Sequence, residues 1–140
     1  MNRLIRMNFG PWNTDLGLLV LRLAFGIGLF IEHGLFKIPL LFDPAAQFPD
    51  PLGLGVKFTV MFAFLSDGIC AVLMLLGAAT RFAALIMIIN LTVAWGAVYG
   101  FQIEPANGEL LFLYLGGAIA LGLTGPGRYS LDARFGRGIQ

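Results

Sequence analysis

The sequence predicts an all-α integral membrane protein, folded as one four-helix bundle over residues 1–140. The 140-residue chain is 58% hydrophobic and only 12% charged, with a mean hydropathy of +0.84, whereas soluble domains carry about 25% charged residues. Four long apolar runs follow one another along the chain. Four spans of about 20 residues each would use most of the apolar side chains, so no separate extramembrane domain is expected.

The first helix is expected over residues 16–36. This run is long enough to cross a bilayer, and charged residues rather than a small-residue cleavage site follow it, so we interpret it as a retained helix and not as a signal peptide. Pro39 and three further prolines in residues 38–55 are expected to break the helix. The apolar residues among them predict a Pro-rich loop that lies in the membrane interface.

The second and third helices are expected over residues 56–79 and 82–101. Only two residues separate these runs, so the two helices are predicted to be antiparallel neighbours. The fourth helix is expected over residues 107–124, where the turn-forming sequence Gly125-Pro126-Gly127 ends it.

The orientation of the helices follows from the cationic residues in the connections, because cytoplasmic loops carry an excess of Lys and Arg. With both termini inside, only Lys37 and Lys57 lie outside. The cytoplasmic set is then Arg3, Arg6, Arg81, Arg128, Arg134 and Arg137. The sequence therefore predicts a multi-pass protein of a bacterial-type cytoplasmic (inner) membrane, with both termini cytoplasmic.

The composition excludes several kinds of function. A net charge of +1 gives no electrostatic footprint for nucleic acid, and the single cysteine, Cys70, cannot form a dithiol and is expected in the core. One histidine with scattered acids offers no metal-ligand spacing, so neither a metal nor an intrinsic cofactor is expected. The 19 glycines indicate close helix packing, for example through Gly116-x-x-x-Ala120.

Ionisable residues inside the predicted spans are the most informative, because each costs at least about 2.5 to 3.5 kcal/mol in a bilayer. They are Arg22, Glu32, His33, Asp67 and Glu109. At about 100° per residue, Arg22, His33 and Lys37 share one face of the first helix. We expect Asp67 to compensate a buried cation, and Glu109 to meet His33 or Lys37.

Other interpretations of these residues stay open. Arg22 could brace the inner end of the bundle against Asp132, or pair with Asp67 in a structural ion pair. Glu109 could cap the fourth helix, and Lys37 could be an ordinary flanking charge.

Four segments of the chain resemble the DoxX family of small four-helix membrane proteins, over residues 16–132. They are Leu21-Arg22 through Glu32-His33-Gly34 to Lys37, the Leu75–Arg81 hairpin, Asn107-Gly108-Glu109-Leu110 with Tyr114, and Leu123-Thr124-Gly125-Pro126-Gly127-Arg128-Tyr129-Ser130-Leu131-Asp132. Asp67 departs from the pattern, since such proteins often carry glutamate in the second helix.

The resemblance implies a subunit of a membrane redox complex that delivers electrons to quinone, beside a protein partner. It puts forward Arg22, His33, Lys37, Asp67, Arg81, Glu109, Arg128 and Asp132 as functional positions.

The leading hypothesis is a quinone-like ligand held between the helices. His33, Asp67 and Glu109 are the expected proton-transfer residues; Arg22, Glu32, Lys37 and Tyr114 the expected ligand contacts; and Arg81, Arg128, Ser130 and Asp132 the expected structural signature. The alternatives are a non-enzymatic assembly or sorting factor, and a small-molecule or proton carrier. The carrier would act as a homo-oligomer, because four helices are few for alternating access.

Overall fold

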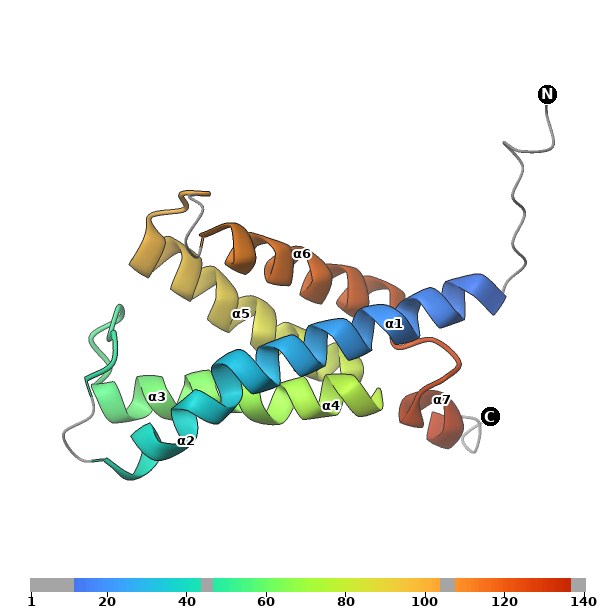
Figure 1. Cartoon of the computed structure of the whole chain (residues 1–140), viewed down its shortest axis with the longest axis horizontal. Helices are drawn as coiled ribbons and strands as arrows, with labels where there is room; N and C mark the ends of the chain where they lie inside the picture. The colour runs from blue at the N-terminus through green and yellow to red at the C-terminus, as the bar shows by residue number, and fades with distance from the viewer. Residues whose placement is uncertain (1–11, 44–46, 104–107, 137–140) are drawn as a thin grey trace.

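A computed structural model describes residues 12–43, 47–103 and 108–136 of the chain (Figure 1). In chain order its helical segments are α1 Trp12–Leu29, η1 Phe30–Gly34, α2 Leu35–Phe42, α3 Val56–Phe64, η2 Leu65–Cys70, α4 Ala71–Leu76, α5 Thr80–Tyr99, α6 Gly108–Thr124 and α7 Leu131–Gly136. The segments η1 and η2 are π-helical turns, in which backbone bonds run from residue i to i+5.

The segments join into four long rods and the short helix α7. The first rod runs without a break through α1, η1 and α2, and the second through α3, η2 and α4. Three rods, Thr14–Phe42, Val56–Leu76 and Thr80–Tyr99, are long and apolar enough to cross a membrane. Helix α6 has 17 residues, the lower limit for a span. The predicted all-α membrane fold is confirmed at this level, and the orientation of the termini stays a prediction.

The expectation that Pro39 ends the first helix is wrong. Pro39 lies inside α2, which continues to Phe42. Its side chain is on the exposed face of the helix, its fixed φ suits a helix, and membrane helices tolerate the loss of one backbone hydrogen bond. The loop is therefore shorter than predicted, and its residues 44–46 lie outside the described part of the chain.

The second rod ends earlier than expected, and the third begins earlier. Gly77 ends α4 in the left-handed conformation with φ 65°, and α5 begins at Thr80 rather than at residue 82. The tight link between the two rods is confirmed. At the other end of α5, Gly100 again adopts a left-handed conformation and closes the helix at Tyr99.

The two π-helical turns pack against each other, and Gly34 makes this possible. A Cβ atom on Gly34 would lie 2.6 Å from the backbone oxygen of Asp67 and 3.1 Å from Cα of Gly68, so only glycine fits. Because of the extra residue in η1, the buried residues Leu29 and Gly34 are five positions apart. The regular helical face predicted for the first helix is therefore shifted by one residue beyond Leu29.

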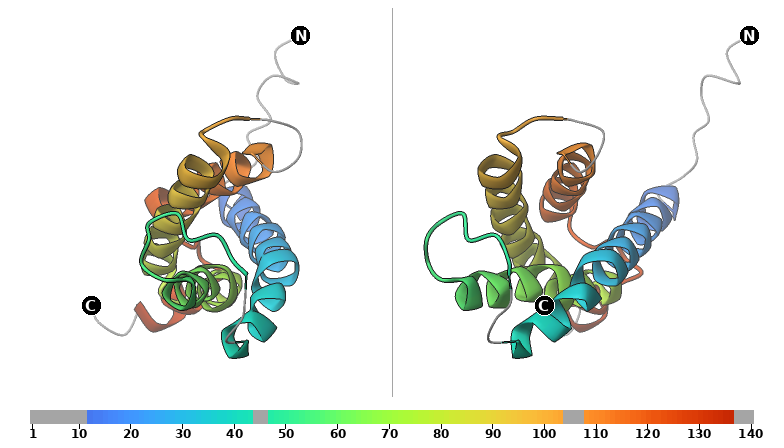
Figure 2. Two further views of the ribbon diagram at one scale, coloured as in Figure 1. Left: turned by 90° about the vertical axis from the view of Figure 1, so that its left-hand side faces the viewer. Right: turned by 60° about the vertical axis from the view of Figure 1, so that its left-hand side comes forward.

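The core lies between the four rods, which Figure 2 shows from two further directions. Its large side chains come from every rod and include Leu29, Met74, Met87 and Leu121. Gly117 and Gly122 of α6 face Phe25 and Ala84. A Cβ atom on Gly116, in contrast, would have nothing within 4 Å, so the packing expected at Gly116 is not made among the described residues.

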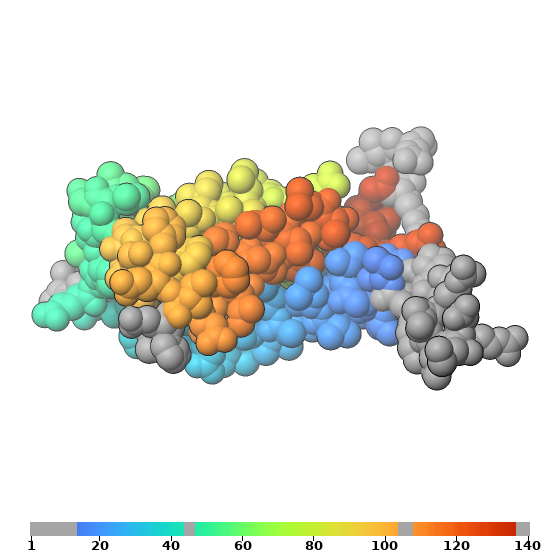
Figure 3. Space-filling model, turned by 90° about the horizontal axis from the view of Figure 1, so that it is seen from above, coloured from blue at the N-terminus to red at the C-terminus, as the bar shows by residue number. Residues whose placement is uncertain are grey.

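The bundle has two distinct ends. The start of α1 lies at the same end as α7, whereas α2, the start of α3, the end of α5 and the start of α6 lie at the opposite end (Figures 1 and 3). We call these the α7 end and the α2 end. The two ends of the described chain are therefore on the same side of the bundle.

Candidate ligand-binding site

A cavity of about 260 Å³ lies at the α2 end, where all four rods and the loop after α2 meet. Its walls are mainly apolar and include Leu29, Phe36, Phe48, Ala63, Leu91, Ala94, Val98, Leu110 and Leu111. A smaller polar set lines the same space: His33, Lys37, Thr59, Asp67, Asn90, Tyr99 and Tyr114. An apolar cavity with a few converging polar groups is the usual form of a small-molecule site.

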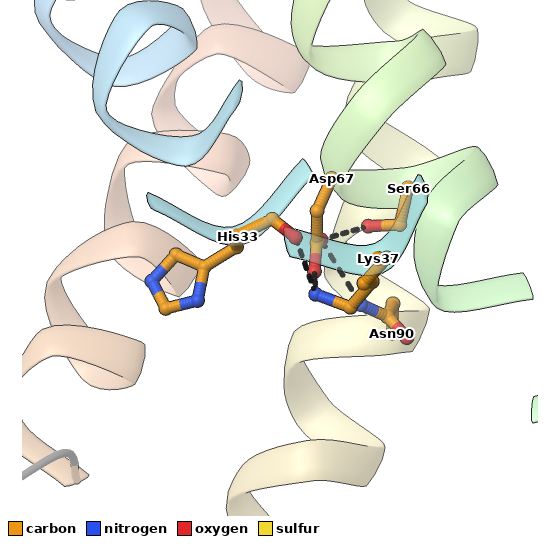
Figure 4. A network of polar contacts seen from close by, with 5 residues as sticks. All are labelled: His33, Lys37, Ser66, Asp67 and Asn90. Carbon is orange, nitrogen blue, oxygen red and sulfur yellow. Dashed lines mark hydrogen bonds and ion pairs between the residues drawn. The ribbon is translucent and has the colours of Figure 1, made fainter. Parts of the chain in front are cut away.

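A buried ion pair forms the polar wall of this cavity. Lys37 Nζ lies 2.8 Å from Asp67 Oδ2, and both side chains are 8% exposed. Lys37 also donates a hydrogen bond to the backbone carbonyl of His33 at 3.0 Å. The other carboxylate oxygen of Asp67 accepts hydrogen bonds from Ser66 Oγ at 2.8 Å and Asn90 Nδ2 at 3.1 Å (Figure 4). Every charged atom of the pair is thus compensated, as burial requires.

The π-helical turns place this ion pair. Asp67 lies within η2, and Lys37 follows η1 by three residues. Because Gly34 lets the two turns touch, the two side chains meet where the first and second rods approach each other closely. Such π-turns are frequent at functional sites, since the extra residue redirects a side chain without ending the helix.

Several polar groups in the cavity remain open to a ligand. Among the described residues, neither the His33 ring nor the Tyr114 hydroxyl makes a hydrogen bond, and the Asn90 amide oxygen accepts none. The His33 ring points away from the ion pair (Figure 4) and meets Tyr114 edge-on, at 6.2 Å between ring centroids. A Cβ on Gly28 would lie 2.6 Å from the Tyr114 hydroxyl, so Gly28 makes room for this phenol.

The loop before α3 contributes one side of the cavity. The Phe48 ring lies 6.0 Å from Lys37 Nζ, within cation–π range. The Asp50 carboxylate fixes the loop by accepting hydrogen bonds from Leu54 N at 3.1 Å, Gly55 N at 2.8 Å and Thr59 Oγ1 at 3.0 Å. These bonds, led by that from Gly55, lower the pKa of Asp50.

Three of the seven residues predicted to transfer protons or to contact the ligand do not line this cavity. Glu32 and Glu109 are exposed and do not line the cavity, and Glu109 occupies the first turn of α6. Arg22 is fully buried toward the α7 end and donates a hydrogen bond through Nη2 to the carbonyl of Tyr129. Its Nε and Nη1 atoms have no partner among the described residues. Asp67 therefore compensates Lys37 and not Arg22.

The four signature residues gather at the α7 end. Asp132 accepts hydrogen bonds from Ala79 N at 2.7 Å and Thr80 N at 2.9 Å, which caps α5. Ser130 Oγ donates to the Gly127 carbonyl at 2.6 Å. The remaining two are arginines: Arg128 pairs with Asp15 at 3.4 Å, and the exposed Arg81 lies near Gly125.

Sequence reasoning did not identify Ser66, Asn90 or Phe48 as site residues. Asn90 had a usable signal, since an amide in the middle of an otherwise apolar run needs a hydrogen-bond partner. Ser66 gave a weaker signal, through its position next to Asp67. Phe48 gave no signal in the sequence, because its position depends on how the loop folds back.

Comparison with known proteins gives one result. A family model described as DoxX matches residues 17–100. No curated protein and no solved structure matches the chain. Within the described residues, no group of three or more His, Cys, Asp or Glu side chains could hold a metal ion.

Proposed function

Because the chain belongs to the DoxX family of membrane proteins, we propose that it is the membrane subunit of a redox complex and holds a quinone-like ligand in the cavity at its α2 end. The observation that supports this most is the buried Lys37–Asp67 pair on the wall of an otherwise apolar cavity. Ionisable groups at membrane depth are expensive and commonly belong to ligand sites or proton relays.

The size and chemistry of the cavity suit the ring of a quinone. Its volume of about 260 Å³ is slightly below the ~300 Å³ at which drug-sized pockets begin, so a ring fits and an isoprenoid tail stays outside among lipids. Lys37 and Tyr114 supply donors for quinone carbonyl oxygens. The apolar walls, such as Ala94 and Val98, contact the ring faces.

Reduction of a quinone takes two electrons and two protons and converts both carbonyls to hydroxyls. The electrons come from a redox centre on a partner protein, because the chain has one cysteine and no dithiol of its own. The chain binds and orients the ring and excludes water around it. His33 and the Asp67 hydrogen-bond network lie on the cavity wall and are the groups that exchange protons with it.

Filling the cavity tests the proposal. Ala94 lines the cavity, whereas Ala97, about one turn away on α5, is exposed and does not line it. We expect decylubiquinone to raise the unfolding temperature of the purified protein in detergent. Ala94→Phe is expected to weaken binding about tenfold or more, which is about 1.4 kcal/mol. Ala97→Phe is the matched control and is expected to bind as the unaltered chain does.

A second variant tests the hydrogen bonding alone. Tyr114→Phe keeps the ring and removes the hydroxyl, so binding is expected to weaken about two- to tenfold, as for the loss of one hydrogen bond. If decylubiquinone gives no thermal stabilisation and no quinone is extracted from the purified protein, the proposal is wrong. Equal binding by the Ala94→Phe and Ala97→Phe variants would place any quinone outside the cavity.

One observation favours a second candidate function, that of an assembly or sorting factor. Gly116 of α6 is exposed, and a Cβ atom there would have no neighbour within 4 Å, which leaves a small-residue surface for a helix of another membrane protein. Gly116→Leu is then expected to abolish co-purification of a partner without affecting quinone binding. Gly17→Leu is the control, because Gly17 is equally open on α1.

A further inference from the structure

The α7 end of the bundle carries more positive than negative charge. Among the described residues it holds four arginines and only two acids: Arg22, Arg81, Arg128 and Arg134 against Asp15 and Asp132. Both carboxylates are already engaged. Asp132 accepts from two backbone N–H groups of the α4–α5 link, and Asp15 pairs with Arg128. This end therefore has a surplus of guanidinium groups.

A second hollow, of about 490 Å³ and widely open to the outside, lies on the surface of this end. Arg128 and Arg134 line it, together with Tyr129, Ser130 and Leu76. Arg134 has no ion-pair partner within the part of the chain that the structure describes. The buried Arg22 guanidinium lies next to Ser130, with Nε and Nη1 unpartnered among the described residues, and adds its positive charge from behind the cavity wall.

We propose that this cavity binds a phosphate group, the anion that phospholipid headgroups and inorganic phosphate share. Planar guanidinium groups hold phosphate through paired N–H···O bonds, and here Arg134 and Arg128, whose Nε already contacts Asp15 at 3.4 Å, flank one open hollow. The Tyr129 hydroxyl adds a further donor. The site is separate from the quinone cavity, since the two share no lining residue.

The surroundings of the cavity favour a lipid as the source of the phosphate. Tyr129 is 49% exposed and Phe135 is 71% exposed on the segment that forms the cavity. Exposed aromatic residues beside arginines are typical of the headgroup level of a bilayer. Leu76, 52% exposed at the end of the second rod, offers an apolar contact for the start of an acyl chain. Basic pockets at helix ends bind anionic lipid headgroups by this combination.

The test measures thermal unfolding of the full chain in a neutral detergent at constant ionic strength. The added probes are dioctanoyl phosphatidylglycerol, dioctanoylglycerol, which lacks the phosphate, and inorganic phosphate. We expect the phosphatidylglycerol to raise the unfolding temperature and the dioctanoylglycerol to leave it unchanged. Arg134→Gln is expected to weaken the apparent affinity about tenfold, as for the loss of one charge-assisted bond.

Arg81→Gln is the matched control. It removes the same charge at the same end, but Arg81 does not line the cavity, so the lipid effect is expected to persist. Stabilisation by inorganic phosphate alone, lost in Arg134→Gln, would support the phosphate site and assign it to free phosphate. The proposal is overturned if dioctanoylglycerol stabilises as well as phosphatidylglycerol, or if Arg134→Gln and Arg81→Gln respond alike. Native mass spectrometry of retained phospholipids on the same variants provides a readout that does not depend on stability.

Discussion

The Lys37–Asp67 pair is the residue-scale feature on which the α2 end of the bundle depends. Each partner alone would leave an unpaired charge inside a membrane protein, whereas together they share a 2.8 Å contact and three further hydrogen bonds. Replacing a buried pair by apolar residues is often neutral, but removing one partner is costly. The pair therefore specifies which helices meet more than it adds stability.

A double-mutant cycle tests this view. Lys37→Met and Asp67→Leu are each expected to lower the free energy of unfolding by about 3 to 5 kcal/mol, because each strands a buried charge. The double variant is expected to recover a large part of that loss. Unfolding in SDS–detergent mixtures gives the measurement, and Lys57→Met is the control, since Lys57 is exposed. Additive losses in the double variant would show that the two charges are not coupled.

At the residue scale, the sequence predicted which residue types matter better than which residues meet. Asp67 was expected to compensate a buried cation, with Arg22 as one named partner, and the structure pairs it with Lys37 instead. Glu109 was expected to meet His33 or Lys37 and is instead exposed on α6. The spacing of residues on one helix predicts which side chains share a face. The residue that they meet on another helix depends on the rotation and the axial shift of each rod, and the two π-turns change the rotation and the shift.

At the scale of the elements, the contact between the two π-turns gives a sharp prediction. Gly34→Ala is expected to destabilise the protein by about 1 to 3 kcal/mol, the usual cost of overpacking, because its Cβ would lie 2.6 Å from the Asp67 backbone oxygen. Gly17→Ala is expected to be neutral or stabilising by up to about 1 kcal/mol, since nothing lies within 4 Å of its Cβ position. The unfolding temperatures of the two variants measure the difference. Equal effects of Gly34→Ala and Gly17→Ala on stability would contradict the close contact at Gly34.

The loop before α3 is expected to respond to acid. The hydrogen bonds to Asp50 lower the pKa of its carboxyl group in the folded protein. A carboxylate with a lowered folded pKa stabilises the structure above its unfolded pKa, about 4, and loses that contribution as the pH falls through the folded value. We therefore expect the loop to stay ordered at neutral pH and to loosen below about pH 4.

The amide resonance of Gly55, which bonds to Asp50 Oδ2, measures this transition by NMR in detergent. In Asp50→Asn the amide has no ionisable partner, so its resonance is expected to lie near the acid form at every pH. A Gly55 shift that titrates unchanged in that variant would mean that another group controls the loop.

The elements themselves could largely be predicted, and their irregularities could not. The apolar runs predicted all four rods within a few residues at most ends. The largest error was the end of the first helix, because Pro39 lies on its exposed face and is accommodated within α2. The π-turns could not be recognised from the sequence. One extra residue in a turn leaves the mean hydropathy of the apolar run almost unchanged, and it changes only which side chains face inward.

At the scale of the whole molecule, the orientation in the membrane can be measured with introduced cysteines. The predicted topology places Lys57 outside and Arg81 inside, and both side chains are exposed. Lys57→Cys is expected to react with a membrane-impermeant maleimide on intact cells, and Arg81→Cys only after permeabilisation. The unaltered chain is the control, because Cys70 is fully buried. The reverse labelling pattern would invert the topology and place the phosphate site in the outer leaflet.

The Lys37–Asp67 contact also constrains how the chain enters the bilayer during synthesis. The first rod arrives with a lysine near its end and the second with an aspartate near its middle, and a charge at the centre of a span disfavours insertion by about 2.5 to 3.5 kcal/mol. The second rod by itself is therefore less stable in lipid than its apolar length suggests. The nascent first rod is expected to stay at the insertion machinery until the second emerges, so that the two leave as a hairpin in which Lys37 already neutralises Asp67.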